Sequence, residues 1–236
     1  MIKFLINFIR YYKTFFRYGL GYEGEAWFTN NYIWPYKKEG FYIDIGCYHP
    51  IKFSQTFKLY KLGWTGINID ISKESIDLFN LFRPKDINLN IGISLKSGLE
   101  DGYFNKKIST TNSIGQDYSY NTNKKKIFIR KIKTKTINQI FEEYHISEVD
   151  FLKIDCEGMD LSIIKTLNFD KYKVNFLSIE FLYDDAGSFI KNKNSNIQSV
   201  HQLFFKSELY QVLKNNFELI DHFGFAFLLA NKKIYA

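Results

Sequence analysis

The stretch that decides the fold is Phe41-Tyr-Ile-Asp-Ile-Gly46, an apolar, β-branched and aromatic run interrupted by one carboxylate and ended by a glycine. Such a run is typical of a buried strand in a parallel sheet covered by helices on both faces. A buried carboxylate is costly unless it is hydrogen-bonded or lies in the crevice at the strand's carboxyl end. We therefore expect Asp44 to face a ligand, with Gly46 letting the backbone approach it. The alternative is an ordinary strand followed by a turn glycine.

Strands and helices alternate after this run. The sequence predicts further strands at 67–70, 87–91, 149–155 and 174–181, and helices at 55–62, 72–83, 136–145, 158–167 and 200–215. Strands and helices that alternate with short joins predict a doubly wound α/β sheet with right-handed crossovers. The last stretch, 217–230, has a tight turn at Gly224 and predicts an antiparallel pair that closes the mostly parallel sheet.

The 236 residues suit one α/β domain. We divide the chain into an N-terminal amphipathic helix at 1–20 and a domain at 21–236. The domain is predicted to carry an irregular insertion at about 97–126 and an exposed edge strand at 127–132. Polar side chains form only a narrow stripe on the N-terminal helix, so its apolar arc must be covered by the domain, by a second copy in a homodimer or by an anionic membrane.

The charge and the cysteines limit the partners and the compartment. A formal net charge of +7 favours acidic partners such as nucleotide-sugars, nucleic acid or anionic lipid. Cys47 and Cys156 are too few for a disulfide framework or a four-cysteine zinc site, so we expect free thiols. The sequence lacks an apolar run of about 18 residues and a recognisable signal peptide. We expect a cytoplasmic protein, with residues 1–17 available for peripheral contact with the inner face of the membrane.

Four predicted strands end on a carboxylate: Asp44, Asp70, Asp155 and Glu180. The carboxyl ends of parallel strands meet at one edge of a sheet, where open α/β sheets bind ligands. A carboxylate after the second strand can accept hydrogen bonds from both hydroxyls of an adenosine ribose. The turn Gly46-Cys-Tyr-His-Pro50 has one glycine and a bulky tyrosine, which argues against a dinucleotide with its pyrophosphate. S-adenosylmethionine is an adenosine ligand without phosphates and meets this requirement.

Several stretches of the sequence resemble the FkbM-type methyltransferase family. The matching stretches are 24–25, 41–46 with 54–56, 63–70, 87–92 and 150–158, the last reading Asp-Phe-Leu-Lys-Ile-Asp-Cys-Glu-Gly. The resemblance implies a class I Rossmann-like fold and an O-methyltransferase that uses S-adenosylmethionine, often on a hydroxyl of a sugar or secondary metabolite.

The resemblance also implies the residues that contact the cofactor. They are Glu25, Asp44, Gly46, Thr56, Asp70 and Asn90. We expect their neighbours Cys47, Tyr48, Ile71, Ile91 and Gly92 to complete the site. The chain departs from the family at two places: the turn at 48–50 is bulkier than is common, and position 70 is Asp where Glu is frequent.

Methyl transfer to a sugar hydroxyl needs a base or a cation, because the hydroxyl is a weak acid. We expect Asp155 and Glu180 to hold Mg²⁺ or a similar divalent metal ion, with His222 as a third ligand or as the base. The alternatives are that Asp155 and Glu157 only cap the helix after them and that His222 is a turn histidine. His49 is a second candidate base.

These observations predict an O-methyltransferase for a sugar hydroxyl, on a nucleotide-sugar or a surface glycan, in bacterial polysaccharide or capsule biosynthesis. A nucleic-acid methyltransferase is the first alternative. The sequence lacks an Asp/Asn-Pro-Pro-Tyr signature and an RNA-binding module, so we expect no nucleic-acid substrate. The second alternative is a non-catalytic interaction protein on the same fold.

Overall fold

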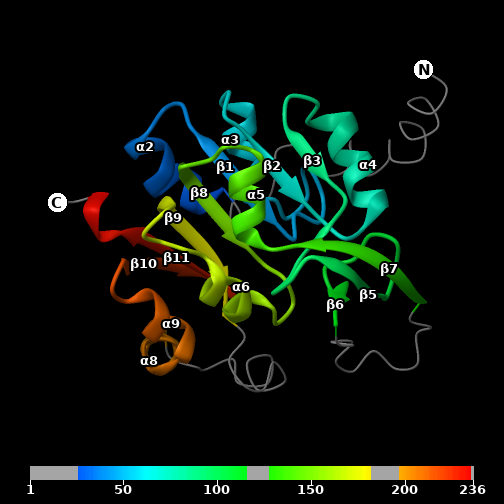
Figure 1. Ribbon diagram of the computed structural model, residues 1–236. Coiled ribbons are helices and arrows are strands. Elements are labelled where there is room, and N and C mark those ends of the chain that lie inside the picture. The colour runs from blue at the N-terminus through cyan, green and yellow to red at the C-terminus, as the bar shows by residue number, and fades with distance from the viewer. Residues whose placement is uncertain (1–25, 116–127, 182–196, 235–236) are drawn as a thin grey trace.

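The structure is a computed structural model that describes residues 26–115, 128–181 and 197–234, with only the backbone of 197–199. Its centre is a seven-stranded sheet flanked by helices (Figure 1). The strands are β1 (Phe41–Ile45), β2 (Thr65–Ile69), β3 (Ile87–Leu89), β8 (Glu148–Ile154), β9 (Lys173–Glu180), β10 (Phe217–Phe223) and β11 (Ala226–Asn231). They lie in the order β10-β11-β9-β8-β1-β2-β3.

The strand directions confirm the predicted fold class. Strands β3, β2, β1, β8 and β9 pair in parallel. Strand β11 is antiparallel to both of its neighbours, β9 and β10. The chain is therefore an α/β protein with a Rossmann-like sheet that is mostly parallel and closed by an antiparallel C-terminal strand.

Helices cover both faces of the large sheet, as a parallel sheet requires. The described helical segments are a π-helix η1 (Thr29–Ile33), α2 (Trp34–Tyr36), α3 (Phe57–Lys61), α4 (Lys73–Phe82), α5 (Ile137–Glu143), α6 (Asp160–Thr166), α8 (Ile197–Lys206), α9 (Glu208–Leu213) and a 3₁₀ helix η2 (Lys232–Ile234). Helices α5, α6, α8 and α9 share one apolar core with the sheet. Segments η1 and α3 share a second core on the other face.

A row of polar residues crosses the second of these faces. Asn68, Asp44, Lys153 and Ser178 lie opposite one another on β2, β1, β8 and β9. All four are buried. Buried polar groups are costly, so such a row is not explained by folding alone. It lies beside the carboxyl ends of the strands, where the predicted site residues gather.

A smaller sheet has the order β4-β7-β5-β6. Its strands are β4 (Gly92–Ile93), β5 (Gly98–Phe104), β6 (Ser113–Ile114) and β7 (Phe128–Lys135). The segment at 97–126 was expected to be irregular, but its described part contains β5 and β6. The predicted edge strand at 127–132 lies in β7, and its residues 128–132 pair with β5 alone among the described strands, because β4 pairs only with Thr134 and Lys135. Ile132 is buried while Lys131 and Lys133 are exposed, so the alternation reflects one packed face.

The helix boundaries follow the predicted caps with one exception. Ser72 caps α4, and Thr136 with Gln139 forms the predicted capping box of α5. The single helix predicted at 200–215 is wrong, because the chain forms α8 and α9 instead. The Ser207 hydroxyl accepts a hydrogen bond from the backbone N–H of Tyr210 and so begins a new helix.

Residues 1–25, 116–127, 182–196 and 235–236 lie outside the described residues. The predicted N-terminal helix and the candidate cofactor residue Glu25 belong to these parts of the chain. Among the helices that are described, none has both the length and the apolar character needed to cross a membrane.

Candidate active site

A first cavity lies at the carboxyl ends of β1, β2 and β8. Six of the predicted cofactor residues line it: Gly46, Tyr48, Asp70, Ile71, Ile91 and Gly92. Gly46 is required at its position, because a Cβ atom there would lie 1.8 Å from the backbone oxygen of Asp155. Its φ of +73° also favours glycine. The close approach brings the loops after β1 and β8 together at the cavity.

Asp70 follows β2 directly and lines this first cavity. Its Oδ2 accepts a hydrogen bond from the backbone N–H of Tyr48 at 2.8 Å, and its Oδ1 accepts one from Ser72 at 2.7 Å. Burial raises the pKa of the Asp70 carboxyl to about 6. Each carboxylate oxygen has a second lone pair, so the group is fixed in place and can still accept two hydroxyl hydrogen bonds.

Asp44 and Thr56 are not among the residues that line this cavity, and their contact with the cofactor stays a prediction. Asp44 is almost fully buried, and its Oδ2 accepts a hydrogen bond from the Thr56 hydroxyl at 2.7 Å. Arg83, also buried, donates to the same hydroxyl at 2.7 Å. The other carboxylate oxygen of Asp44 lies 3.4 Å from the Lys153 ammonium. These residues therefore support the site through Lys153.

Two more predicted cofactor residues, Cys47 and Asn90, are not among the residues that line the first cavity. Cys47 is buried beside α4. The Asn90 amide donates to the backbone oxygens of Asp70 and Ile71, so it holds the loop that carries the Asp70 carboxylate. His49, the second candidate base, accepts hydrogen bonds at Nδ1 from two backbone N–H groups. Burial lowers the pKa of His49 to about 4, so this imidazole is a neutral part of the loop.

A second cavity adjoins the first one. Lys153, Asp155 and Phe53 line both cavities. Asp155 lies 3.3 Å from the Lys153 ammonium, which also donates a hydrogen bond to the backbone oxygen of Gly46 at 2.8 Å. Burial acts to lower the pKa of Lys153, but the charges of Asp155 and Asp44 outweigh it and raise the pKa. The boundary between the cavities thus carries a fixed ammonium and a carboxylate.

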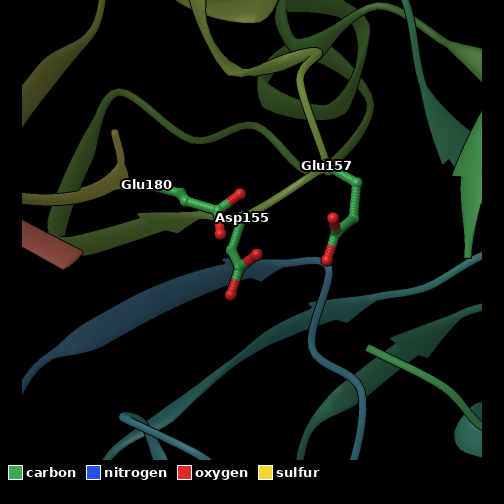
Figure 2. Close-up of side chains that lie close together, drawn as sticks. All are labelled: Asp155, Glu157 and Glu180. Carbon is green, nitrogen blue, oxygen red and sulfur yellow. The ribbon is translucent and has the colours of Figure 1, made fainter. Parts of the chain in front are cut away.

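Three carboxyl groups gather beside this boundary, with oxygen atoms within 4.8 Å of one another: Asp155, Glu157 and Glu180. Figure 2 shows Glu180 extending toward Asp155. Burial, followed by the nearby charge of Asp155, raises the pKa of Glu180 to about 10 and that of Glu157 to about 8. Near neutral pH the cluster therefore holds protons that a cation could replace, and carboxylate oxygens are the ligands that Mg²⁺ prefers.

The sequence did not predict that Glu157 belongs to this acidic cluster. We considered it only as a cap of the following helix. Helix α6 begins without a side-chain cap from Asp155 or Glu157. Asp160 instead accepts hydrogen bonds from the backbone N–H groups of Cys156 and Gly158. Glu157 has a φ of +49°, which is uncommon for a residue with a side chain. This backbone conformation was not visible in the sequence, although the Asp-Cys-Glu-Gly turn was.

The structure does not bring His222 to the acidic cluster, which corrects its prediction as a metal ligand or base. Residues that face each other on paired strands project from the same face of a sheet. Glu180 lies opposite Ala226, and Ala226 lies opposite Phe223. The pairing register of β10 shifts by one residue at a β-bulge, so Phe223 rather than His222 shares the face of Glu180.

His222 lies on the opposite face of the sheet, across from Phe227. Its Nδ1 is 2.9 Å from the Nε2 of His201 on α8. Burial and the neighbouring His201 lower the pKa of His222. The two histidines therefore interact with each other and with the apolar core, on the face of the sheet opposite Glu180.

The sheet order and the cavities at the carboxyl ends of the strands define the class of this protein as a Rossmann-like α/β protein with a ligand site at this edge of the sheet. The chain matches the family model described as the methyltransferase FkbM domain over residues 44–215, and it belongs to that family. A comparison with curated proteins found no match. The family match confirms the resemblance seen in the sequence and shows that the protein is a methyltransferase.

Proposed function

We propose that the protein transfers a methyl group from S-adenosylmethionine to a hydroxyl of a sugar, on a nucleotide-sugar or a surface glycan. The observation that carries this proposal is that Asp155 lines both cavities. A donor in the first cavity and an acceptor in the second would meet at this carboxylate. Methyl transfer mainly requires that the two reactants be aligned, so a shared boundary suits the reaction.

The first cavity fits the adenosine part of S-adenosylmethionine. The Asp70 carboxylate is held by two backbone N–H groups and can accept hydrogen bonds from both ribose hydroxyls. Ile71 and Ile91 supply apolar wall beside it for the adenine ring. When bound, S-adenosylmethionine supplies a methyl group on a positively charged sulfur.

The acceptor hydroxyl must lose its proton as its oxygen forms the new bond. We propose Asp155 as the group that takes this proton. Lys153 orients Asp155, and it is itself held by Asp44 and by the backbone oxygen of Gly46. This support fixes the carboxylate at the boundary of the cavities, where a positioned base is most effective.

We also propose that Asp155, Glu157 and Glu180 hold Mg²⁺ or a similar divalent ion. Carboxylate oxygens suit such ions. Burial and then the charge of Asp155 raise the pKa of Glu180, and a positive ion would stabilise its ionised form. When bound, a divalent ion lowers the pKa of a hydroxyl that coordinates it.

Substitution at Asp70 tests the cofactor site. We expect Asp70→Asn to weaken S-adenosylmethionine binding at least tenfold in calorimetry, because an amide offers one acceptor atom in place of two. The control is Asp77→Asn on α4, where the carboxylate pairs with Lys73 at the surface. Its affinity should match that of the wild type. Failure of the wild type to bind S-adenosylmethionine would refute the proposed function.

Titration of the wild type and of Glu180→Gln with metal ions tests the ion site. We expect Mg²⁺ or Mn²⁺ binding to release protons, because Glu180 must ionise to become a ligand. Calorimetry in two buffers with different ionisation enthalpies measures this release. Glu180→Gln should abolish binding, whereas Glu142→Gln, at an exposed ion pair with Lys171, should not change it. Full methyl transfer by chelator-treated protein would show that the ion is not needed.

Other expectations from the sequence stay predictions. They include a homodimer, a cytoplasmic location, contact of residues 1–17 with an anionic membrane, and the lack of a nucleic-acid substrate. Co-sedimentation of the full chain with phosphatidylglycerol vesicles, compared with a variant that lacks residues 1–17, tests the membrane contact. Equal binding of both proteins would contradict it.

A further inference from the structure

Three residues that line the second cavity each have a buried polar side-chain atom with no hydrogen-bond partner among the described residues. They are the Oε1 of Gln55, the Oγ of Ser178 and the Oε2 of Glu180. The Ser178 side chain is almost fully buried, with a relative exposure of 1%. Buried polar groups in folded proteins are nearly always paired, so three unpaired ones on residues around the same cavity point to a ligand that pairs them.

The walls of this cavity are aromatic. They include Phe28, Phe53, Phe223 and Phe225. Phe53 and Phe223 are 44% and 51% exposed, which is high for phenylalanine and leaves ring surface for a ligand to cover. Gly224 and Phe225 form the two-residue turn between β10 and β11. The backbone N–H of Phe181 donates to the oxygen of Phe225 at 2.9 Å, which ties this turn to the end of β9.

The charge of the cavity indicates which ligands it excludes. Lys153 is the only cation among the described residues that line it, and Asp44 and Asp155 already pair with this ammonium. Glu180 and Asp155 add acidic groups. A divalent ion would bring two positive charges to three carboxyl groups, so the site would not become positive. The two carboxylates that pair with Lys153 outnumber it, so the described lining offers an anionic group no unpaired positive charge.

We propose that the second cavity binds the acceptor as an uncharged glycosyl ring, with its hydroxyls on Gln55, Ser178 and Glu180 and its apolar C–H face against Phe223. This inference rests on the proposed function and narrows its substrate class. Polar atoms on one side and aromatic rings on the other match a ring that is itself polar at its edge and apolar on its face. A diphosphate or a carboxylate carried by the same acceptor lies outside the cavity.

The proposal is tested with glycosides of matched shape and different charge. Methyl hexopyranosides, the corresponding methyl uronates and the corresponding methyl hexosaminides are offered to the full chain with S-adenosylmethionine present. Binding is measured by saturation-transfer NMR and methyl transfer with labelled donor. We expect at least one neutral glycoside to bind and its uronate to bind at least tenfold more weakly. Tighter binding of the uronate or of the cationic hexosaminide would overturn the inference.

Two variants connect the binding to this cavity. Phe223→Ala should weaken glycoside binding about tenfold, whereas Phe205→Ala, an exposed phenylalanine on α8 that lines neither cavity, should leave it unchanged. Ser178→Ala should weaken binding severalfold while leaving the melting temperature unchanged or raised, because the free protein loses an unpaired buried hydroxyl. Unchanged glycoside affinity in both Phe223→Ala and Ser178→Ala would contradict binding of the glycosyl ring in the second cavity.

The outcomes separate this inference from the proposed function. Binding of S-adenosylmethionine depends on the first cavity and is measured without an acceptor. If the donor binds but every glycoside fails to bind, the assignment of a glycosyl ring to the second cavity is wrong, whereas the methyl-donor site in the first cavity is supported. If the donor itself does not bind, the proposed function fails as well.

Discussion

At the scale of single residues, the Thr56 hydroxyl connects two buried charged side chains. Its hydroxyl donates to Asp44 and accepts from Arg83, and all three residues are buried. We expect Thr56→Val to lower the free energy of unfolding by about 1–3 kcal/mol, because valine has nearly the same shape but leaves a buried carboxylate and guanidinium without their partner. Chemical denaturation of both proteins measures the difference.

The control for this prediction is Thr65→Val, at an exposed position on β2. It should change the free energy of unfolding by no more than about 0.5 kcal/mol. Equal effects at positions 56 and 65 would contradict a supporting role for the Thr56 hydroxyl. Because Lys153 is held by Asp44, Thr56→Val should also slow methyl transfer more than it weakens donor binding.

The sequence located the acidic residues of the site but not their neighbours in space. A carboxylate at the end of a buried strand is visible as a pattern, so Asp70, Asp155 and Glu180 were found. Whether such a side chain lines a cavity or lies behind it depends on contacts from distant parts of the chain. Asp44 is not among the residues that line the first cavity, and Thr56 and Lys153 contact it instead.

At the scale of secondary structure, the loops after β1 and β8 meet at Gly46. A Cβ atom at this position would overlap the backbone of Asp155. Gly63 has a φ of +99° but nothing within 4 Å of the position of a Cβ atom. We expect Gly46→Ala to destabilise the protein by more than about 2 kcal/mol beyond the effect of Gly63→Ala. Comparing the two variants isolates the steric clash, since a positive φ is common to both.

The matching measurements are thermal unfolding and S-adenosylmethionine binding of the two glycine variants. Gly63→Ala should bind the donor normally. Gly46→Ala should bind it weakly if it folds, because the loop after β8 must move away from the first cavity. If both variants were equally stable and active, the close approach of the two loops would not be needed.

The β10–β11 hairpin shows why strand prediction did not locate every site residue. Two strands and a tight turn were predictable from the alternation and from Gly224. The bulge in β10 was not, since one extra residue leaves the pattern of apolar residues readable in either register. Without it His222 would lie opposite Ala226 and face Glu180, as we expected. With it, Phe223 occupies that place and becomes part of the second cavity.

At the scale of the whole molecule, buried titratable groups determine how stability changes with pH. Burial raises the pKa of Asp70 to about 6, of Asp160 to about 7, of Glu157 to about 8 and of Glu180 to about 10. In the unfolded chain such carboxyl groups titrate near pH 4. Between these values the folded protein holds protons that the unfolded chain releases, so its stability falls as pH rises.

His49 acts in the other direction at lower pH. Its pKa is about 4 in the folded protein and about 6.5 in the unfolded chain, so it destabilises the fold as pH falls through this range. Above pH 6.5 His49 no longer contributes, so among these residues only the carboxyl groups change the stability, and they lower it as pH rises. We therefore expect the urea midpoint to decrease from about pH 6.5 to pH 9.

Glu180→Gln and added Mg²⁺ should both make this decline shallower, for different reasons. The substitution removes the carboxyl group whose pKa is raised furthest within the acidic cluster, and bound Mg²⁺ replaces its proton with a cation. The effect of Mg²⁺ should disappear in Glu180→Gln, whereas the control Glu142→Gln should behave as the wild type. A midpoint that stays constant or rises between pH 6.5 and 9 would mean that the carboxyl groups ionise without cost. The stability of the folded protein would then not depend on the proton content of the cluster.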